Sequence, residues 1–188
     1  MSDFDFITDT ALRSNINRAN ELILELVLLS ESEGYQERPS LVSSLRKTIV
    51  IHTASIVEAV LLWKLKQKYR SGEAEIDDEW EYRDPHKIHD LTDQIEQIVW
   101  CRRKQVKKRV DRLDFMHVTR LCEKHALLRG EKLVEDVNAI REMRNNIHIG
   151  NLADIDRDYQ PADLEFCFSV LKRVKEMIEV EPVPSQYL

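Results

Sequence analysis

Glycine and proline are scarce in this chain, whose 188 residues include only four glycines and five prolines. An all-β fold needs many tight turns, and these two residue types supply most of them. The phosphate-binding motifs GxGxxG and GxxxxGK[ST] also need clustered glycines, and the four glycines here are isolated. The scarcity therefore argues against an all-β fold, excludes these nucleotide-binding loops and favours a mainly α-helical protein.

Cysteine is equally rare, and Cys101, Cys122 and Cys167 form no CxxC pair. An odd number of dispersed cysteines argues against a disulfide framework. The N-terminus lacks the basic region of a secretion signal, and no uninterrupted run of about 18 apolar residues occurs. We therefore expect a cytoplasmic protein that does not enter a membrane.

Motifs for common catalytic centres are missing as well: there is no GxSxG elbow and no HExxH helix. The nearest approaches to a metal site are His86 and His89 with Asp90 and Asp93, and Cys122 with His125. Neither group has the four-ligand spacing of a structural zinc site. We expect no metal ion and no other cofactor.

The residues that are present suit a helical domain, with 43% apolar and 33% charged residues. Each glycine follows a helix-like segment, where a C-cap glycine belongs: Gly34, Gly72, Gly130 and Gly150. Apolar periodicity, together with prolines at the starts of two segments, predicts helices over 9–32, 39–70, 115–130, 131–150 and from Pro161 onward. The segment 39–70 is apolar on nearly every side in its middle, so it is expected to be central.

The predicted fold class is mainly α, a helical bundle of about five helices in a single domain covering residues 1–188. Residues 73–112 are a charged insertion, and 181–188 are a non-helical tail. We expect a small β element around residues 79–110.

Charge in this insertion is segregated, although the chain as a whole carries a net charge of −6. The charged residues of 73–84 are all acidic except Arg83, and those of 102–112 are all basic except Asp111. Two structures remain open for 91–113. The apolar residues fit one amphipathic helix; alternatively, a hairpin turns near Arg102-Arg103, and Trp80 and Tyr82 belong to an edge strand. We favour the β element, in which the acidic and basic segments pair across strands.

The basic run also has two interpretations. It can supply phosphate contacts to a nucleic acid through five cations: Arg102, Arg103, Lys104, Lys107 and Lys108. It can equally be a solvated surface, or the partner of the acidic segment.

The one stretch that indicates a chemistry is 136–150, expected to be a helix ending at Gly150. Its polar side chains share one edge of the last two turns: Arg141, Arg144, Asn145 and His148. Two guanidinium groups, an amide and an imidazole can bind and act on a phosphate. The structural alternative is a C-terminal cap, in which the same cations interact with the helix dipole.

Glu58 lies in the apolar middle of the predicted central helix. It is either a functional carboxylate or an ion-pair partner that orients an arginine, or else a partly exposed surface residue or a member of a structural pair.

At these residues the chain resembles the HEPN superfamily (higher eukaryote and prokaryote nucleotide-binding domains). The family's signature is an arginine, four to six residues and a histidine, often with an asparagine after the arginine. Six residues separate Arg141 from His148, which satisfies the pattern; Arg144-Asn145 supplies the Arg-Asn pair, but only three residues separate Arg144 from His148. Which arginine is functional stays open. The stretch Ala54-Ser-Ile-Val-Glu58-Ala is similar to the small-residue and glutamate pattern on an early helix of these domains.

The resemblance implies a compact helical domain and, in many members, a metal-independent endoribonuclease of toxin–antitoxin, defence or RNA-processing systems. It implies a homodimer that brings two motifs together, RNA as substrate and an antitoxin or other protein as a further partner. His148 would act as acid or base, the arginines would stabilise phosphate charge, and Asn145 would orient the histidine or bind phosphate. The alternative is a non-catalytic helical module that binds a nucleotide, RNA or protein.

Overall fold

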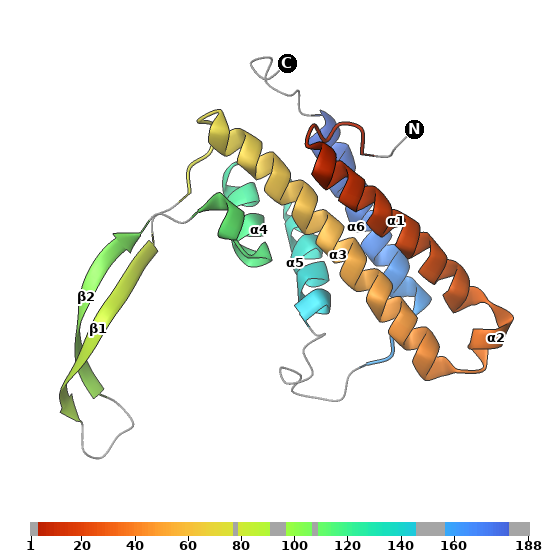
Figure 1. The fold of residues 1–188 in the computed structure, drawn as a ribbon, viewed down its shortest axis with the longest axis horizontal. Helices are drawn as coiled ribbons and strands as arrows, with labels where there is room; N and C mark the ends of the chain where they lie inside the picture. Colours follow the sequence, from red (N-terminus) through yellow and green to blue (C-terminus); the bar gives the residue numbers. More distant parts are fainter. Residues whose placement is uncertain (1–3, 77–78, 91–96, 107–108, 146–156, 181–188) are drawn as a thin grey trace.

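A computed structural model describes residues 4–76, 79–90, 97–106, 109–145 and 157–180 (Figure 1). Within these ranges the chain is mainly α-helical, as the sequence predicts. The helices are α1 (Thr10–Glu31), α2 (Glu33–Gln36), α3 (Pro39–Arg70), α4 (Phe115–Lys124), α5 (Glu131–Asn145) and α6 (Pro161–Val180). The remaining elements are β1 (Glu79–Asp90), β2 (Gln97–Val106) and the short 3-10 helix η1 (Val110–Arg112).

Local capping explains where several helices begin. The side chain of Asp9 accepts a hydrogen bond from the backbone N–H of Leu12 at 3.0 Å and caps α1. Asp114 caps α4 in the same way, accepting from the N–H of His117 at 2.9 Å. Pro39 occupies the first turn of α3, where its missing N–H costs nothing. The predicted ranges 9–32 and 39–70 are confirmed.

Two predictions drawn from glycines are wrong. Gly34 does not cap α1, which ends at Glu31 with Ser32 as its C-cap, but lies inside α2, a short helix that the periodicity does not indicate. The predicted helix over 115–130 stops at Lys124, because Ala126 adopts φ 55° and the N–H of Leu127 turns back to the carbonyl of Cys122 at 2.7 Å. The predicted continuation of α5 to Gly150 and the tail 181–188 lie outside the described residues.

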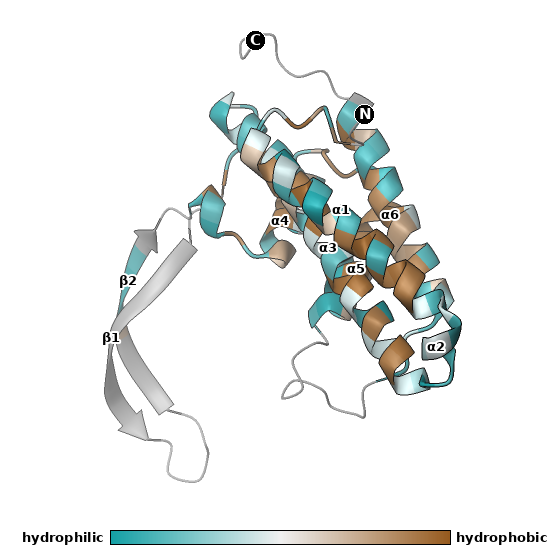
Figure 2. Ribbon diagram, turned by 45° about the vertical axis from the view of Figure 1, so that its right-hand side comes forward, coloured by the Kyte–Doolittle hydropathy of each residue, from teal (hydrophilic) through white to brown (hydrophobic). Residues whose placement is uncertain are grey.

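Helix α3 runs through the middle of the helical body and contacts α1, α4, α5 and α6 (Figure 1). Its buried positions occur on every side, including Ile49, Val50, Val57 and Leu61. By length and composition α3 is apolar enough to cross a membrane, but most of its apolar stretch is buried inside the body. Figure 2 shows the apolar, brown stretches of the helices. The expectation of a central helix over 39–70 is confirmed.

A buried carboxylate fixes α5 against α6. Asp136 on α5 is only 4% exposed. It accepts a hydrogen bond from Arg173 Nη1 on α6 at 2.7 Å, and Lys132 Nζ lies 2.9 Å away. Burial alone would raise the pKa of Asp136, but the hydrogen bonds and charges of Arg173 and Lys132 outweigh it and lower this pKa. The Asp136–Arg173 contact thereby holds α5, whose last turn carries Arg144, against α6.

Strands β1 and β2 pair in an antiparallel two-stranded sheet, called the ribbon below. Within 91–113 the β alternative is therefore correct for Gln97–Val106, whereas Val110–Arg112 form η1 and residues 91–96 and 107–108 lie outside the described residues. The turn predicted near Arg102-Arg103 is wrong. These residues lie within β2, opposite Arg83 and Tyr82. Trp80 and Tyr82 lie in β1 itself, not in a further strand. The register shifts between Arg83 and His86, where Pro85 stands, because proline cannot donate to a strand ladder.

The cross-strand register shows how the charged segments meet. Glu81 is opposite Lys104, which is the acidic–basic pairing expected, whereas Arg83 is opposite Arg102. Like charges directly opposite each other destabilise a strand pair. The charges in the described strands are therefore only partly matched.

The ribbon stands away from the helical body (Figure 1). Within the described ranges, the backbone of neither strand comes near the backbone of any helix. The helices therefore do not support the ribbon by packing against it.

Candidate functional site

An ion pair joins the last turn of α5 to the middle of α3. Arg144 Nη1 lies 2.8 Å from Glu58 Oε2, and their side chains are 31% and 20% exposed. The guanidinium carbon of Arg144 is also 5.9 Å from the centre of the Phe115 ring on α4. Three helices thus converge on one arginine. Of the possibilities open for Glu58, the structure shows the ion pair with an arginine.

Three influences, two of which raise its pKa and one of which lowers it, act on the Glu58 carboxyl. Burial disfavours its ionised form and raises its pKa, the neighbouring Arg144 lowers it, and the carboxylate of Asp114 raises it again. The net effect is a pKa above the ordinary value of 4.5. Arg144 is therefore oriented by a carboxylate that is ionised less readily than an exposed glutamate.

Arg141, the other candidate arginine, has a different environment. Its Nε donates to Asn138 Oδ1 at 3.3 Å, and its Nη2 lies 3.5 Å from Glu142 Oε1. Both of these partners belong to α5 itself. Arg141 is therefore held along its own helix, whereas Arg144 is held across the fold by Glu58. This difference favours Arg144 as the arginine that the tertiary structure positions.

Of the other two candidates, the structure describes only Asn145. Asn145 is the last residue of α5 and is exposed. His148 is outside the described residues, together with the rest of 146–156. The sequence places His148 four positions after Arg144.

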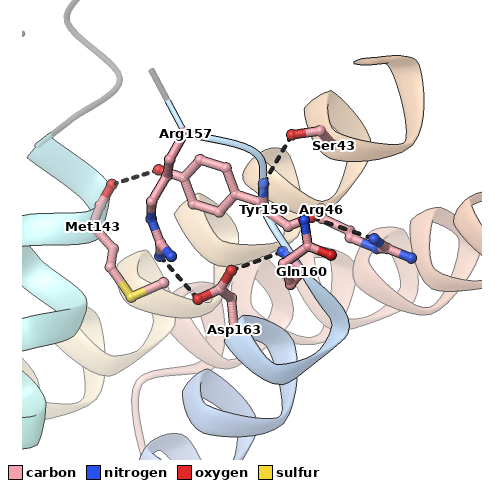
Figure 3. A network of polar contacts seen from close by, with 7 residues as sticks. All are labelled: Ser43, Arg46, Met143, Arg157, Tyr159, Gln160 and Asp163. Atoms are coloured by element: carbon pink, nitrogen blue, oxygen red, sulfur yellow. Dashed lines mark hydrogen bonds and ion pairs between the residues drawn. The ribbon is translucent and has the colours of Figure 1, made fainter. Parts of the chain in front are cut away.

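Tyr159 anchors the residues before α6 to helices α3 and α5 (Figure 3). Its ring is buried, its hydroxyl donates a long hydrogen bond to the carbonyl of Met143 at 3.4 Å, and its N–H donates to Ser43 Oγ at 2.9 Å. Its carbonyl accepts a hydrogen bond from Arg46 at 3.3 Å. Tyr159 therefore connects the last turn of α5 with the first turns of α3.

Next to Tyr159, two further interactions order the start of α6. Asp163 accepts hydrogen bonds from Arg157 Nη2 at 2.9 Å and from the N–H of Gln160 at 2.8 Å (Figure 3). A cavity of about 150 Å³ opens here between α3 and the residues before α6, with Ser43, Arg46 and Gln160 in its lining. The sequence indicates only a polar loop over 151–160 and does not single out Tyr159; a lone aromatic residue in a polar segment before Pro161 is the available signal.

The basic run lies elsewhere in the fold. Arg102, Arg103 and Lys104 lie on β2 and are exposed, and Lys107 and Lys108 are outside the described residues. In the described ranges, β2 does not approach α5. The structure therefore brings Glu58 to Arg144 but does not bring Arg102, Arg103 or Lys104, the described part of the basic run, to them.

Of the residues considered for metal binding, Cys122 and His125 have ordinary structural partners. Cys122 is buried, and burial raises the pKa of its thiol to about 12. His125 Nε2 lies 2.9 Å from the carbonyl oxygen of Glu75. In the part of the chain that the structure describes, no three His, Cys, Asp or Glu residues are grouped so that they could hold a metal ion.

No protein-family model, curated protein or solved structure matches the chain. A function must therefore be inferred from the residues of the chain and their geometry.

Proposed function

We propose that the protein is a HEPN-like RNA-binding protein that cleaves RNA at the C-terminal end of α5. The observation that carries this proposal is the Glu58–Arg144 ion pair at 2.8 Å. A carboxylate from the central helix fixes a guanidinium directly before Asn145 and four residues before His148. Such a fixed cation suits a site that binds a phosphodiester.

The proposed reaction is an internal phosphoryl transfer. The ribose 2′-oxygen attacks the adjacent phosphorus, the bond from phosphorus to the 5′-oxygen breaks, and a 2′,3′-cyclic phosphate and a 5′-hydroxyl end result. His148 takes the 2′-OH proton or gives a proton to the leaving 5′-oxygen, since an imidazole with a pKa of about 6.5 suits either task. Arg144 and Arg141 stabilise the negative charge on the phosphoryl oxygens, and Asn145 orients the histidine or the phosphate.

One histidine per motif supplies either the acid or the base, and a homodimer would supply both. We therefore propose that two copies pair with their α5 ends together. Light scattering coupled to gel filtration would measure the mass directly; a monomer at the concentrations that support cleavage would contradict this part of the proposal.

The deciding experiment compares RNA cleavage by the wild type and by His148→Ala in the presence of EDTA. We expect the wild type to release cyclic-phosphate ends and His148→Ala to lose at least about 100-fold in rate. His125→Gln is the matched control, because it removes an imidazole that contacts the backbone carbonyl of Glu75 and is not one of the proposed site residues. Equal cleavage by wild type and His148→Ala, or no cleavage by either over diverse RNAs, would refute the proposed ribonuclease activity.

A second candidate function is a non-catalytic RNA-binding module. It is favoured by the pairing of both arginines with carboxylates, Arg144 with Glu58 and Arg141 with Glu142, which reduces the positive charge offered to a substrate. This module would bind RNA without cleaving it. It would also be insensitive to His148→Ala and sensitive to charge reversal at Arg102, Arg103 and Lys104.

A further inference from the structure

The cavity beside Tyr159 is built from two segments that lie far apart in the sequence. The first turns of α3 contribute Val42, Ser43 and Arg46, and the other wall is formed by residues 158–160 before α6. Its volume is about 150 Å³, and a cavity of this size in another protein holds benzene. The cavity is therefore large enough for a flat aromatic group but not for a whole nucleotide.

Hydrogen bonds fix the wall that residues 158–160 form. The N–H of Tyr159 donates to Ser43 Oγ at 2.9 Å, and its carbonyl accepts from Arg46 Nη1 at 3.3 Å (Figure 3). The N–H of Gln160 donates to Asp163 at 2.8 Å. Because these bonds join the wall to α3 and α6, the cavity is preformed, as ligand sites usually are.

Two residues in the lining, Arg46 and Asp158, have opposite hydrogen-bonding character. Arg46 uses one of its five N–H donors for the Tyr159 carbonyl, and among the described residues its side chain has no other partner. The carboxylate of Asp158 can only accept, and its side chain also has no partner among these residues. A ligand that presents acceptors to Arg46 and donors to Asp158 would satisfy both.

Guanine has both patterns on its edges. Its O6 and N7 are neighbouring acceptors, to which an arginine commonly binds with two N–H groups. Its N1–H and N2–H₂ are neighbouring donors, which suit the two oxygens of a carboxylate. Adenine carries an amino donor where guanine has O6, and uracil has one N–H donor between two acceptors. Neither of these bases therefore offers both pairs.

The charges around Tyr159 favour an anionic ligand. Lys47 Nζ and Arg157 Cζ lie 5.8 and 5.0 Å from the centre of its ring, and Arg46 bonds to its carbonyl. Counting the carboxylate of Asp158 and the one that pairs with Arg157, the net charge of this group stays positive. A nucleotide, which carries a phosphate beside its base, is thus favoured over a neutral base.

We propose that this cavity binds a guanine base of single-stranded RNA, with Arg46 donating to O6 and N7 and Asp158 accepting from N1–H and N2–H₂. The proposal rests on the proposed function, in which RNA is the substrate, and gives that substrate a base preference. Tyr159 lines the cavity, and its hydroxyl donates to the carbonyl of Met143, the residue before Arg144, at 3.4 Å. The cleaved phosphodiester should therefore lie close to the bound guanosine. Base pairing occupies the same edge of guanine, so a duplex should not bind here.

The test measures the affinity for labelled RNA heptamers by fluorescence anisotropy, with His148→Ala as the background to prevent cleavage. A heptamer of adenosines with one central guanosine should bind roughly 5- to 150-fold more tightly than the all-adenosine heptamer, the range for one bidentate contact to a base. Inosine lacks the 2-amino group of guanosine, and 7-deazaguanosine lacks N7. Each should bind several-fold more weakly than guanosine, because each removes one hydrogen bond.

Two substitutions assign the preference to the cavity. Arg46→Lys keeps the charge but removes the second N–H group of the fork, and Asp158→Asn replaces an acceptor oxygen by a donor. Each should bring the two heptamers to within a few-fold of each other. Asp158 is exposed, so Asp158→Asn should melt at the temperature of the parent. Arg38→Lys is the matched control, because Arg38 is an exposed arginine outside the cavity lining, and it should keep the full preference.

Three outcomes would overturn the proposal: no preference for the guanosine heptamer, a preference that survives Arg46→Lys and Asp158→Asn together, or binding of guanosine monophosphate as tight as that of the heptamer. The last result would make a free nucleotide the ligand. None of these measurements depends on cleavage. A wild type that binds guanosine RNA through the cavity without cutting it refutes only the ribonuclease activity, and cleavage without a base preference overturns only the cavity site.

Discussion

At the scale of single residues, the central observation is that one arginine of the candidate site is held from another helix. Arg144 has its partner Glu58 on α3, whereas Arg141 pairs with Asn138 and Glu142 on its own helix. The sequence predicts both arginines on one helix edge and leaves the choice open. Helical periodicity describes one helix at a time, so it cannot show which arginine a neighbouring helix contacts. The structure favours Arg144 for this reason.

Glu58→Gln should reduce activity without reducing stability. Because burial raises the pKa of Glu58 in the folded protein, its carboxyl contributes stability below its ordinary pKa of 4.5 and loses it as the pH rises through the folded value. At pH 7 a neutral amide there should leave the free energy of unfolding within about 0.5 kcal/mol of wild type or slightly higher. Cleavage should fall by about 10- to 100-fold, because Arg144 loses its fixed orientation.

Urea unfolding and initial cleavage rates measure these two effects. Glu142→Gln is the control, because it removes the exposed partner of Arg141. A drop in stability beyond about 2 kcal/mol, with activity falling only in proportion to unfolding, would show that Glu58 is merely structural.

Asp136 titrates in the opposite sense. Its pKa is lowered in the folded protein, so its contribution to stability is present above the ordinary value of 3.8 and is lost as the pH falls toward the folded value. Asp136→Asn should therefore destabilise the protein by about 2–3 kcal/mol at pH 7, and the difference should shrink at pH values below 3.8. Thermal unfolding across this pH range measures it; a constant difference at every pH would contradict the ion pair with Arg173.

At the scale of elements, the starts of helices that carry a cap or a proline can be predicted from the sequence. The end of α4 and the choice between helix and strand for residues 91–113 cannot. Asp9 and Pro39 locate the starts of α1 and α3, and Pro161 locates that of α6, because caps and prolines act within one helical turn. The end of α4 is not predictable, because Ala126 adopts a left-handed conformation that its residue type does not suggest. For residues 91–113, apolar residues fit a helix and a strand alike, and only pairing with β1 decides between them.

Tyr159 also acts at this scale, because it joins the end of α5 to α3. Tyr159→Phe keeps the buried ring and removes only the hydroxyl that donates to the Met143 carbonyl. Since that bond is long, at 3.4 Å, the stability should fall by no more than about 1 kcal/mol. We expect a several-fold loss of cleavage, because the segment holding His148 loses one of its anchors. Denaturation and single-turnover rates measure both, and an unchanged rate would show that this anchor does not serve the site.

At the scale of the whole molecule, the two groups of candidate residues belong to separate parts of the fold. The site at the end of α5 lies in the helical body, and Arg102, Arg103 and Lys104 lie on the ribbon. The sequence indicates both groups but not how far apart they are, because the distance depends on where the ribbon leaves the body. In the proposed function, the ribbon would bind RNA and the body would cut it.

Reversing the charges of Arg102, Arg103 and Lys104 to glutamate should therefore weaken RNA binding and reduce its dependence on salt. Removing up to three phosphate contacts should lower the slope of log affinity against log salt by roughly 2 for a single strand. The melting temperature of the helical body should not change, since the ribbon does not pack on it. Titrations at several salt concentrations, with calorimetry of the same variant, measure both quantities; unchanged affinity would leave the basic run as a solvated surface.

The central position of α3 has a consequence for how ligands of this protein can be detected. Because α3 contacts α1, α4, α5 and α6, its amide hydrogens should exchange with solvent only when the whole body opens, whereas ribbon amides should exchange through local opening. A ligand on the ribbon would then slow exchange in β1 and β2 alone and leave α3 unaffected. Thermal-shift screening reports the melting of the body and would miss such a ligand, while hydrogen exchange resolved by segment would find it.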